Sequence, residues 1–286
     1  MATPITDQSI YRQSAPAYQD QVKPSLRSRI GQLLFSSYAL LFYFFLYAPI
    51  ILVVIFSFNT SRFPTHWTGF TLDWYGTLFS DFAIGRALRN TLIVSITSTI
   101  ISTIIGTMVS VGLERYRFRA KSSLDAMLFL PIIIPDIAMA IMLLAFFVLI
   151  NMELGLSTII ISHVAFNIAF VAVIVRARMA SIDPALEEAA NDLYANEWKA
   201  FWKVTFPLLL PGILGGALFA FTLSLDDYVI TFFTSGPGST TLPVRIYSMV
   251  KRGITPEINA VSSLMLLASL FLVPLSLYLQ RKGGDS

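Results

Sequence analysis

The sequence alternates between long apolar runs and shorter polar segments. Six of the apolar runs contain no Lys or Arg. Each is near the roughly 20 residues that a helix needs to cross about 30 Å of hydrocarbon. The fourth run is the shortest and carries His163 and Asn167. We therefore predict six transmembrane helices, at 33–58, 91–113, 124–150, 157–175, 208–233 and 260–279.

The composition supports this interpretation. Of the 286 residues, 55% are hydrophobic and 13% are charged, against about 45–50% and about 25% in typical soluble domains. An ordinary soluble enzyme and intrinsic disorder are both excluded by these values. The chain has no Cys, which excludes disulfides, a thiolate nucleophile and Cys-ligated metal. The sequence thus predicts an all-α integral membrane protein without a metal site.

The Lys and Arg residues are distributed unevenly between the connecting segments. Fourteen of the 20 lie at the N-terminus, in "ERYRFRAK", in 176–206 and in the C-terminal tail, which the six-helix pattern places on one side. The others lie in 59–90 and 234–259. Because cytoplasmic loops carry the excess of positive charge, we predict that both termini are cytoplasmic. This topology accounts for the net charge of +3, so no nucleic-acid partner is expected.

The connection 176–206 is about thirty residues long, more than two neighbouring helices need. Asp183 followed by Pro184 is typical of a helix start, and Asn196 is suited to cap a second helix. We expect Pro207 to end that second helix. Two short helices at a membrane surface fit either a docking surface for a partner or an amphipathic segment on lipid.

The segment "EEAANDLYANEWKAFWKVTFPLLLP" resembles the EAA loop of permease subunits of binding-protein-dependent ABC importers. Glu188, Ala189 and Ala190 match the Glu-Ala-Ala of the family, and Val204 and Pro207 match the ending of its motif. In this family the loop is a coupling helix that inserts into a groove of the ATPase subunit. The resemblance therefore favours the docking interpretation of the loop.

Two positions depart from the family pattern. Phe206 stands where Leu is usual, and Tyr194 stands where Gly is expected. If that Gly turns the chain with positive φ, a Tyr in its place is strained by roughly 1 kcal/mol or more. The resemblance implies the coupling role for Leu186, Glu187, Glu188, Ala189, Ala190, Leu193 and Tyr194.

Further segments resemble the spermidine/putrescine permeases, in particular the C-type permease subunit. They are "IFSFNTSRF", "RYRFRAK", "PDIAMAI", "FTLSLDD" and "SGPGSTTLPVRIYSMVKRGITPEINA". The resemblance implies a type I ABC importer permease fold in a bacterial inner membrane. It also implies three kinds of partner: a second permease chain, two ATPase subunits and an extracytoplasmic substrate-binding protein.

The chain has no G-x-x-x-x-G-K-[ST] phosphate loop. If transport is driven by ATP, then ATP and Mg²⁺ are bound by the ATPase partner, and this chain has no cofactor of its own. We therefore expect a transporter subunit and not an enzyme.

The resemblance and the apolar pattern together predict an order of segments along the chain. Residues 1–30 are polar, and no apolar core precedes residue 33, an order unlike that of a cleaved signal peptide. We expect 1–25 to be mobile. The predicted division is a cytoplasmic tail 1–30, a first helix and external loop 31–85, a permease core 86–280 with the coupling loop 183–207, and a tail 281–286.

Four ionisable residues fall inside predicted spans, where an unpaired charge is costly and usually functional. At about 1.5 Å per residue, Asp136, His163 and Asp226 lie roughly 18–22 Å from the cytoplasmic ends of their helices. Asp227 is the neighbour of Asp226. We predict that these residues belong to one substrate path.

The residues around this level indicate the charge of the substrate. Pro131 and Pro135 are expected to kink or break the third helix and to free carbonyl groups, which are tolerated where they line a cavity. Carboxylates and carbonyls suit the ammonium groups of a polyamine. No predicted span contains Lys or Arg, which argues against an anionic substrate.

Each candidate also has a structural interpretation. Asp136 is suited to cap a helix that restarts after Pro135, and His163 to bond between helices. Asp226 and Asp227 are about 100° apart if they share a helix, so we expect one to contact substrate and the other to pair with a neighbour. Trp67 is either an interfacial anchor or a cation–π contact for the polyamine.

We therefore predict that the chain is a polyamine importer permease. A permease for another small cationic or neutral solute is the alternative within the same class. A proton-coupled secondary transporter also uses mid-membrane Asp and His, but no inverted repeat is visible. A membrane hydrolase is disfavoured because H-E-x-x-H and G-x-S-x-G are absent.

Overall fold

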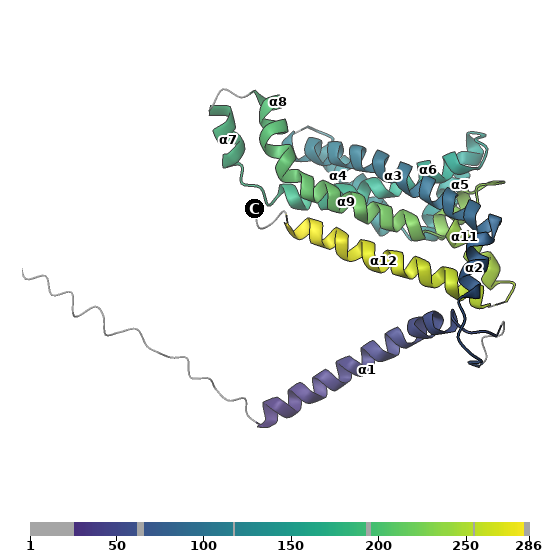
Figure 1. Ribbon diagram of the computed structural model, residues 1–286. Coiled ribbons are helices and arrows are strands. Elements are labelled where there is room, and N and C mark those ends of the chain that lie inside the picture. Colours follow the sequence, from purple (N-terminus) through teal and green to yellow (C-terminus); the bar gives the residue numbers. More distant parts are fainter. Residues whose placement is uncertain (1–25, 62–65, 117, 193–195, 254, 283–286) are drawn as a thin grey trace, which may run out of the picture. The chain divides into compact units, whose positions relative to one another are not determined.

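The computed structural model describes most of the chain (Figure 1). In the described part, the regular secondary structure is helical, apart from one isolated antiparallel bridge between Asn59 and Phe70. The chain separates into two units, Met1–Ile51 and Leu52–Ser286, and the features discussed below lie in the second. The described residues are 26–61, 66–116, 118–192, 196–253 and 255–282.

The helices follow the order of the predicted spans, with short elements between them. They are α1 (Leu26–Phe56), α2 (Asp73–Ser80), α3 (Phe82–Arg115), α4 (Lys121–Ile133), α5 (Asp136–Leu149), α6 (Leu156–Met179), α7 (Ala185–Asp192), α8 (Glu197–Ala200), the π-helical turn η2 (Phe201–Thr205), α9 (Phe206–Asp226), α10 (Val229–Thr234), α11 (Leu242–Val250) and α12 (Pro256–Lys282).

Five helical segments within the described ranges are long and apolar enough to cross a membrane, and each overlaps one predicted span. They are Gly31–Phe56, Phe82–Arg115, Leu156–Met179, Glu197–Asp226 and Pro256–Leu275.

The third predicted span is not one helix. Residues 124–150 are divided between α4 and α5, which meet at an angle of 112°. The break comes at Ile134, whose ψ of 131° is extended. Proline disfavours the helical conformation in the residue before it, so Pro135 accounts for this position. Pro131, in contrast, is accommodated inside α4. The expected proline break of this span is therefore confirmed at Pro135, and no break occurs at Pro131.

The core of the second unit consists of α3, α6, α9 and α12, which run side by side (Figure 1). Small residues allow α3 to approach α6 closely. A Cβ on Gly106 of α3 would lie 2.9 Å from the Val171 side chain of α6. One turn further, the Ser110 hydroxyl donates to the Ala172 carbonyl at 3.0 Å. These contacts hold α3 against α6, the helix that carries His163 and Asn167.

The segment between α10 and α11 is anchored to two core helices. The Asn90 amide on α3 donates to the carbonyls of Gly238 and Thr240. From α6, the Thr158 hydroxyl donates to the Thr234 carbonyl at 2.7 Å. The Gly- and Pro-rich segment is therefore bonded to α3, and the end of α10 that precedes it is bonded to α6.

Candidate functional site

A cavity of about 420 Å³ lies where the broken pair α4–α5 meets the junction of α9 and α10. Its lining includes the carboxylates of Asp136, Asp226 and Asp227. The apolar part of the lining comes from residues such as Phe170 and Leu223. No Lys or Arg is among the described residues that line it. We call this cavity the acidic hollow. The structure thus brings together three of the residues that the sequence analysis assigned to one substrate path.

Asp136 enters the acidic hollow from the start of α5. Pro135 occupies the N-cap position, so Asp136 is in the first helical turn and is not the capping residue considered from the sequence. A carboxylate there is favoured by the positive end of the helix dipole. The side chain is exposed and takes part in no ion pair with the described residues.

Asp226 and Asp227 do not share a helix, which corrects the expectation of a continuous span over 208–233. α9 ends at Asp226, and Asp227 is extended, with φ −61° and ψ 124°. Asp226 is exposed to the acidic hollow and forms no ion pair within the described part of the chain. The two neighbours are therefore separated by a change of backbone direction and not by a helical rotation of about 100°.

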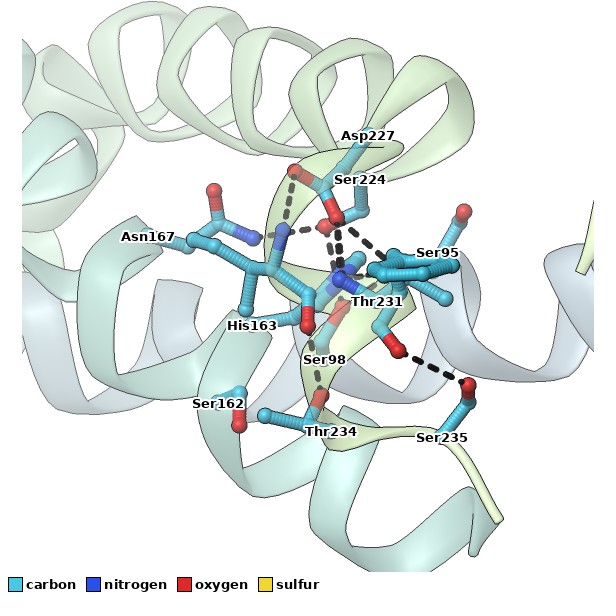
Figure 2. A network of polar contacts seen from close by, with 12 residues as sticks. Ser95, Ser98, Ser162, His163, Asn167, Ser224, Asp227, Thr231, Thr234 and Ser235 are labelled. Carbon is cyan, nitrogen blue, oxygen red and sulfur yellow. Dashed lines mark hydrogen bonds and ion pairs between the residues drawn. The ribbon is translucent and has the colours of Figure 1, made fainter. Parts of the chain in front are cut away.

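Asp227 is held by the elements around it (Figure 2). Its Oδ2 accepts hydrogen bonds of 2.8 Å from both the backbone N–H and the hydroxyl of Thr231. The same oxygen lies 3.3 Å from Nε2 of His163 on α6. The carboxylate therefore accepts hydrogen bonds from N–H groups in the first turn of α10, which have no partner within their own helix. This need for a partner explains why α9 stops where it does.

His163 lies behind the acidic hollow, not in its lining. Its side chain is fully buried, and Nε2 lies 2.9 Å from the Thr231 hydroxyl. Because that hydroxyl donates to Asp227, it accepts from Nε2–H. One turn along α6, the Asn167 amide donates to the Ser224 hydroxyl of α9 at 2.7 Å. The Ser224 hydroxyl also lies 3.2 Å from that of Ser98 on α3. This network joins α3, α6, α9 and α10 at the level of the acidic hollow (Figure 2).

Trp67 is placed elsewhere. Its indole packs edge-to-face on Phe56, with ring centroids 6.4 Å apart, and is not part of the lining of the acidic hollow. Nearby, Trp74 donates its indole N–H to the Asn59 carbonyl at 2.7 Å. Of the five residues assigned to the substrate path, the acidic hollow contains three, His163 supports one of these from behind, and Trp67 is separate.

The loop between α6 and α9 has the two helix starts that the sequence predicts. The Asp183 carboxylate accepts from the Ala185 N–H at 2.9 Å, at the start of α7. The Asn196 side chain accepts from the Lys199 N–H at 2.9 Å, at the start of α8. Both predicted starts are confirmed.

The predicted end of the second helix at Pro207 is wrong. α8, the π-helical turn η2 and α9 form one continuous segment, Glu197–Asp226. In the π turn, the Phe206 N–H donates to the Phe201 carbonyl, five residues earlier. This shift of the bonding pattern comes just before the proline, so the helix accommodates a residue that has no N–H to donate.

The acidic residues of α7 differ in their surroundings. Leu186, Glu188 and Ala189 are exposed. Glu187 instead turns inward, and its Oε1 lies 2.5 Å from a guanidinium nitrogen of Arg115, at the end of α3. Leu193 and Tyr194, which we also assigned to coupling, lie outside the described residues, and so does the turn in which Tyr194 replaces Gly.

Sequence reasoning missed several partners. Thr231 follows Asp227 by four residues, a spacing that places polar neighbours together at a helix start and was an available signal. Arg115 was counted only as one of many positive charges, and its pairing with Glu187 spans 72 residues of sequence. No local pattern indicates that contact.

Comparisons with known proteins agree with this arrangement. The model of the family described as binding-protein-dependent transport system inner membrane component matches residues 102–281. The spermidine/putrescine transport system permease protein PotC of Shigella flexneri is 40% identical over 261 residues, which cover 90% of this chain and 99% of that protein. The putrescine transport system permease protein PotI of Escherichia coli (strain K12) is 40% identical over 234 residues, covering 79% and 83% of the two chains.

A solved structure shows the same fold. It is a bacterial ABC transporter involved in the import of the acidic polysaccharide alginate, and one of its chains matches with a TM-score of 0.68. The match covers 89% of this chain and 96% of that chain, at 19% sequence identity. At this identity the similarity establishes the fold alone.

Proposed function

Because this chain belongs to the family of binding-protein-dependent transport system inner membrane components, we propose that it is a permease subunit of an ATP-driven polyamine importer. The relatives named above are permease proteins of spermidine/putrescine and putrescine transport systems. Their similarity extends over most of this chain, and the family model matches residues 102–281, which include the segments that form the acidic hollow and the loop between α6 and α9. Both parts are needed for a subunit that passes substrate and responds to an ATPase.

The acidic hollow is the observation that carries the substrate assignment. A polyamine carries several ammonium groups joined by methylene chains. The carboxylates of Asp136 and Asp226 are suited to accept charge-assisted hydrogen bonds from ammonium. The apolar side chains of Phe166, Phe170 and Leu223 line the same cavity and are suited to contact the methylenes. A transporter with a similar fold is involved in the import of an acidic polysaccharide, whose charge is opposite to that of a polyamine. We therefore propose that these side chains, and not the fold, determine which charge of substrate is accepted.

Within the acidic hollow, Asp136 and Asp226 are proposed to contact the substrate. Asp227 is proposed to hold the junction of α9 and α10 in place, because its carboxylate is already bound to Thr231 and His163. Loss of the Asp227 charge is then expected to disturb the shape of the cavity, whereas loss of the Asp136 or Asp226 charge weakens binding directly.

The remaining assignments complete the importer. The end of the molecule that carries α7 is proposed to face the cytoplasm, as the distribution of positive charge predicts. There the exposed residues Leu186, Glu188 and Ala189 contact one of two ATPase subunits, which bind ATP and Mg²⁺. A second permease chain completes the path, and an extracytoplasmic binding protein delivers the polyamine at the opposite end.

The proposal is tested by uptake of labelled spermidine and putrescine in source cells with and without this chain, before and after ATP depletion. Loss of ATP-dependent uptake on deletion supports the proposal, and the label that is lost identifies the substrate. Unchanged uptake of both labels in cells that have no second polyamine system would instead favour a permease for another small cationic or neutral solute. Uptake that persists without ATP under an ion gradient would favour a secondary transporter.

A further inference from the structure

Three side chains form a closed set of hydrogen bonds between α7 and the core. One guanidinium nitrogen of Arg115 lies 2.5 Å from Oε1 of Glu187 and donates to the Thr205 hydroxyl at 3.0 Å. The Thr205 hydroxyl in turn donates to Oε2 of Glu187 at 3.2 Å. The Arg115 guanidinium also lies 5.2 Å from the centre of the Phe201 ring. We call Arg115, Glu187 and Thr205 the brace.

The brace is shielded from solvent more than a typical surface ion pair. The Arg115 and Glu187 side chains are 20% and 33% exposed, and Thr205 is 3% exposed. Exposed ion pairs contribute little because water screens them, whereas partly buried pairs with further hydrogen bonds are stronger. The three side chains satisfy one another, so loss of any one of them leaves a shielded polar group without its partner.

The brace connects three elements that have different places in the fold. Glu187 belongs to α7, Arg115 ends the membrane-spanning helix α3, and Thr205 lies in the π turn that leads into α9. Among the α7 residues whose side chains the structure describes, Glu187 is the one whose side chain bonds to another element. π-helical turns frequently mark functional positions. The brace therefore connects the exposed docking surface of α7 to both helices at once.

Other ion pairs at this end of the molecule do not involve α7. Arg176 of α6 pairs with Asp125 of α4 and lies 3.8 Å from Glu114 of α3. Arg178 of α6 donates to the Leu208 carbonyl of α9 at 2.8 Å. These contacts hold the core helices to one another. Among the side chains that the structure describes, Glu187 thus provides the one polar contact between α7 and the core helices, through Arg115 and Thr205.

We propose that the brace transmits movement of α7 into α3 and α9, so that Glu187 and Arg115 position the coupling helix without themselves binding the ATPase. This inference rests on the proposed function, since it assumes that α7 meets an ATPase subunit. It separates two tasks within one short helix. The exposed residues bind the ATPase, and Glu187 transmits the resulting movement of α7 to the membrane helices α3 and α9.

The first test is Glu187→Gln in the complete complex of permease chains, ATPase subunits and binding protein. We expect the ATPase to co-purify in normal amount and to hydrolyse ATP, while labelled spermidine imported per ATP falls roughly three- to tenfold. Asp192→Asn is the matched control, because it removes the same charge from an exposed position of α7 that has no ion pair with the described residues. It is expected to keep the wild-type ratio.

A second pair of variants separates transmission from mere loss of folding. Arg115→Lys retains the charge but replaces the planar guanidinium, which also lies over the Phe201 ring, by a compact ammonium, so its transport-to-ATP ratio is expected to be intermediate. Combining Arg115→Glu with Glu187→Arg restores opposite charges and is expected to recover part of the ratio that each single reversal loses.

Three results would overturn the brace. The first is a wild-type ratio in Glu187→Gln. The second is loss of ATPase binding in Glu187→Gln, which would make Glu187 a docking residue. The third is absence of recovery in a stably assembled double reversal. If the wild-type complex itself shows no ATP-driven polyamine uptake, the proposed function fails, whereas wild-type uptake with an unaffected Glu187→Gln ratio removes only the brace.

Discussion

Two pairs of neighbouring carboxylates, Asp226–Asp227 and Glu187–Glu188, are arranged in the same way at opposite parts of the molecule. In each pair one carboxylate is bound by other elements of the chain, and the other is exposed and forms no ion pair with the described residues. Asp227 and Glu187 are the bound members, whereas Asp226 and Glu188 are the exposed ones. Two adjacent residues of the same type therefore have different roles, because only one of them has hydrogen-bond or ion-pair partners in the neighbouring helices.

The two pairs differ in how the bound member is held. Asp227 is separated from its neighbour by the end of α9 and is bound to a fully buried His163. Glu187 and Glu188 follow one another on a single helix, and the partner of Glu187 is a partly exposed Arg115. Removal of one partner is more damaging where the other is buried. We therefore expect the bound carboxylate of the acidic hollow to affect folding, and that of α7 to affect coupling.

The largest effect is expected for Asp227→Ala. This change leaves the N–H and the hydroxyl of Thr231 without their acceptor and removes the carboxylate beside the buried His163. At about 1–3 kcal/mol for each buried group left unsatisfied, it is expected to destabilise the fold by about 3–5 kcal/mol. Thermal unfolding of the detergent-solubilised protein measures the change. Asp226→Ala is the matched control and should unfold nearly as the wild type does. Equal stability of the two variants would show that Asp227 does not hold the junction.

The next effect is expected for Asp136→Asn combined with Asp226→Asn. Asparagine replaces a charge-assisted hydrogen bond of about 1.5–3 kcal/mol by a neutral one of about 0.5–1.5 kcal/mol. The two changes together should therefore cost about 2–3 kcal/mol and lower polyamine uptake at limiting substrate by roughly thirtyfold to a hundredfold. Complex assembly should stay normal, because neither residue forms an ion pair with the described residues. Wild-type uptake in the double variant would mean that these carboxylates do not contact the substrate.

A smaller effect, on binding of the ATPase, is expected for Glu188→Arg. Reversal of one exposed charge in the docking surface should weaken that binding by about 1–2 kcal/mol, or roughly tenfold. Co-purification of the ATPase measures it. The chain has no cysteine, so Ala189→Cys introduces a single thiol that the bound ATPase should shield from labelling. Undiminished binding, or a thiol that is equally reactive with and without the ATPase, would contradict docking at this surface.

The smallest effect is expected for Thr205→Val. Valine keeps the shape of the side chain but removes one hydroxyl from the brace, a loss of about 1 kcal/mol. Transport per ATP should decrease less than in Glu187→Gln, since the Arg115–Glu187 pair persists. A decrease larger than that of Glu187→Gln would assign the main role to the π turn itself.

The membrane architecture was largely predictable from local patterns. Apolar length predicted the spans, and Pro135 predicted the break between α4 and α5 because it restricts the residue before it. The caps at Asp183 and Asn196 were predictable for the same reason, since a cap depends on residues within one turn.

Features that depend on distant residues were not predictable. α9 ends at Asp226, and Asp227 then lies beside His163 of another helix, a contact that no local pattern indicates. The helix continues through Pro207 because a π turn precedes it, and the packing of Thr205 against Arg115 and Glu187 stabilises that turn. Sequence reasoning therefore predicted that one of the two aspartates pairs with a neighbour, but not which one.

The central claim is that ATP drives polyamine through a path whose exposed carboxylates contact the substrate. Proteoliposomes that contain the complete complex and the binding protein test it most directly. Import of labelled spermidine is measured with and without enclosed ATP, for the wild type and for Asp226→Asn. The account predicts import that requires ATP and is strongly reduced in Asp226→Asn, while the complex remains assembled. Import of equal rate without ATP, or undiminished import by Asp226→Asn, would contradict it.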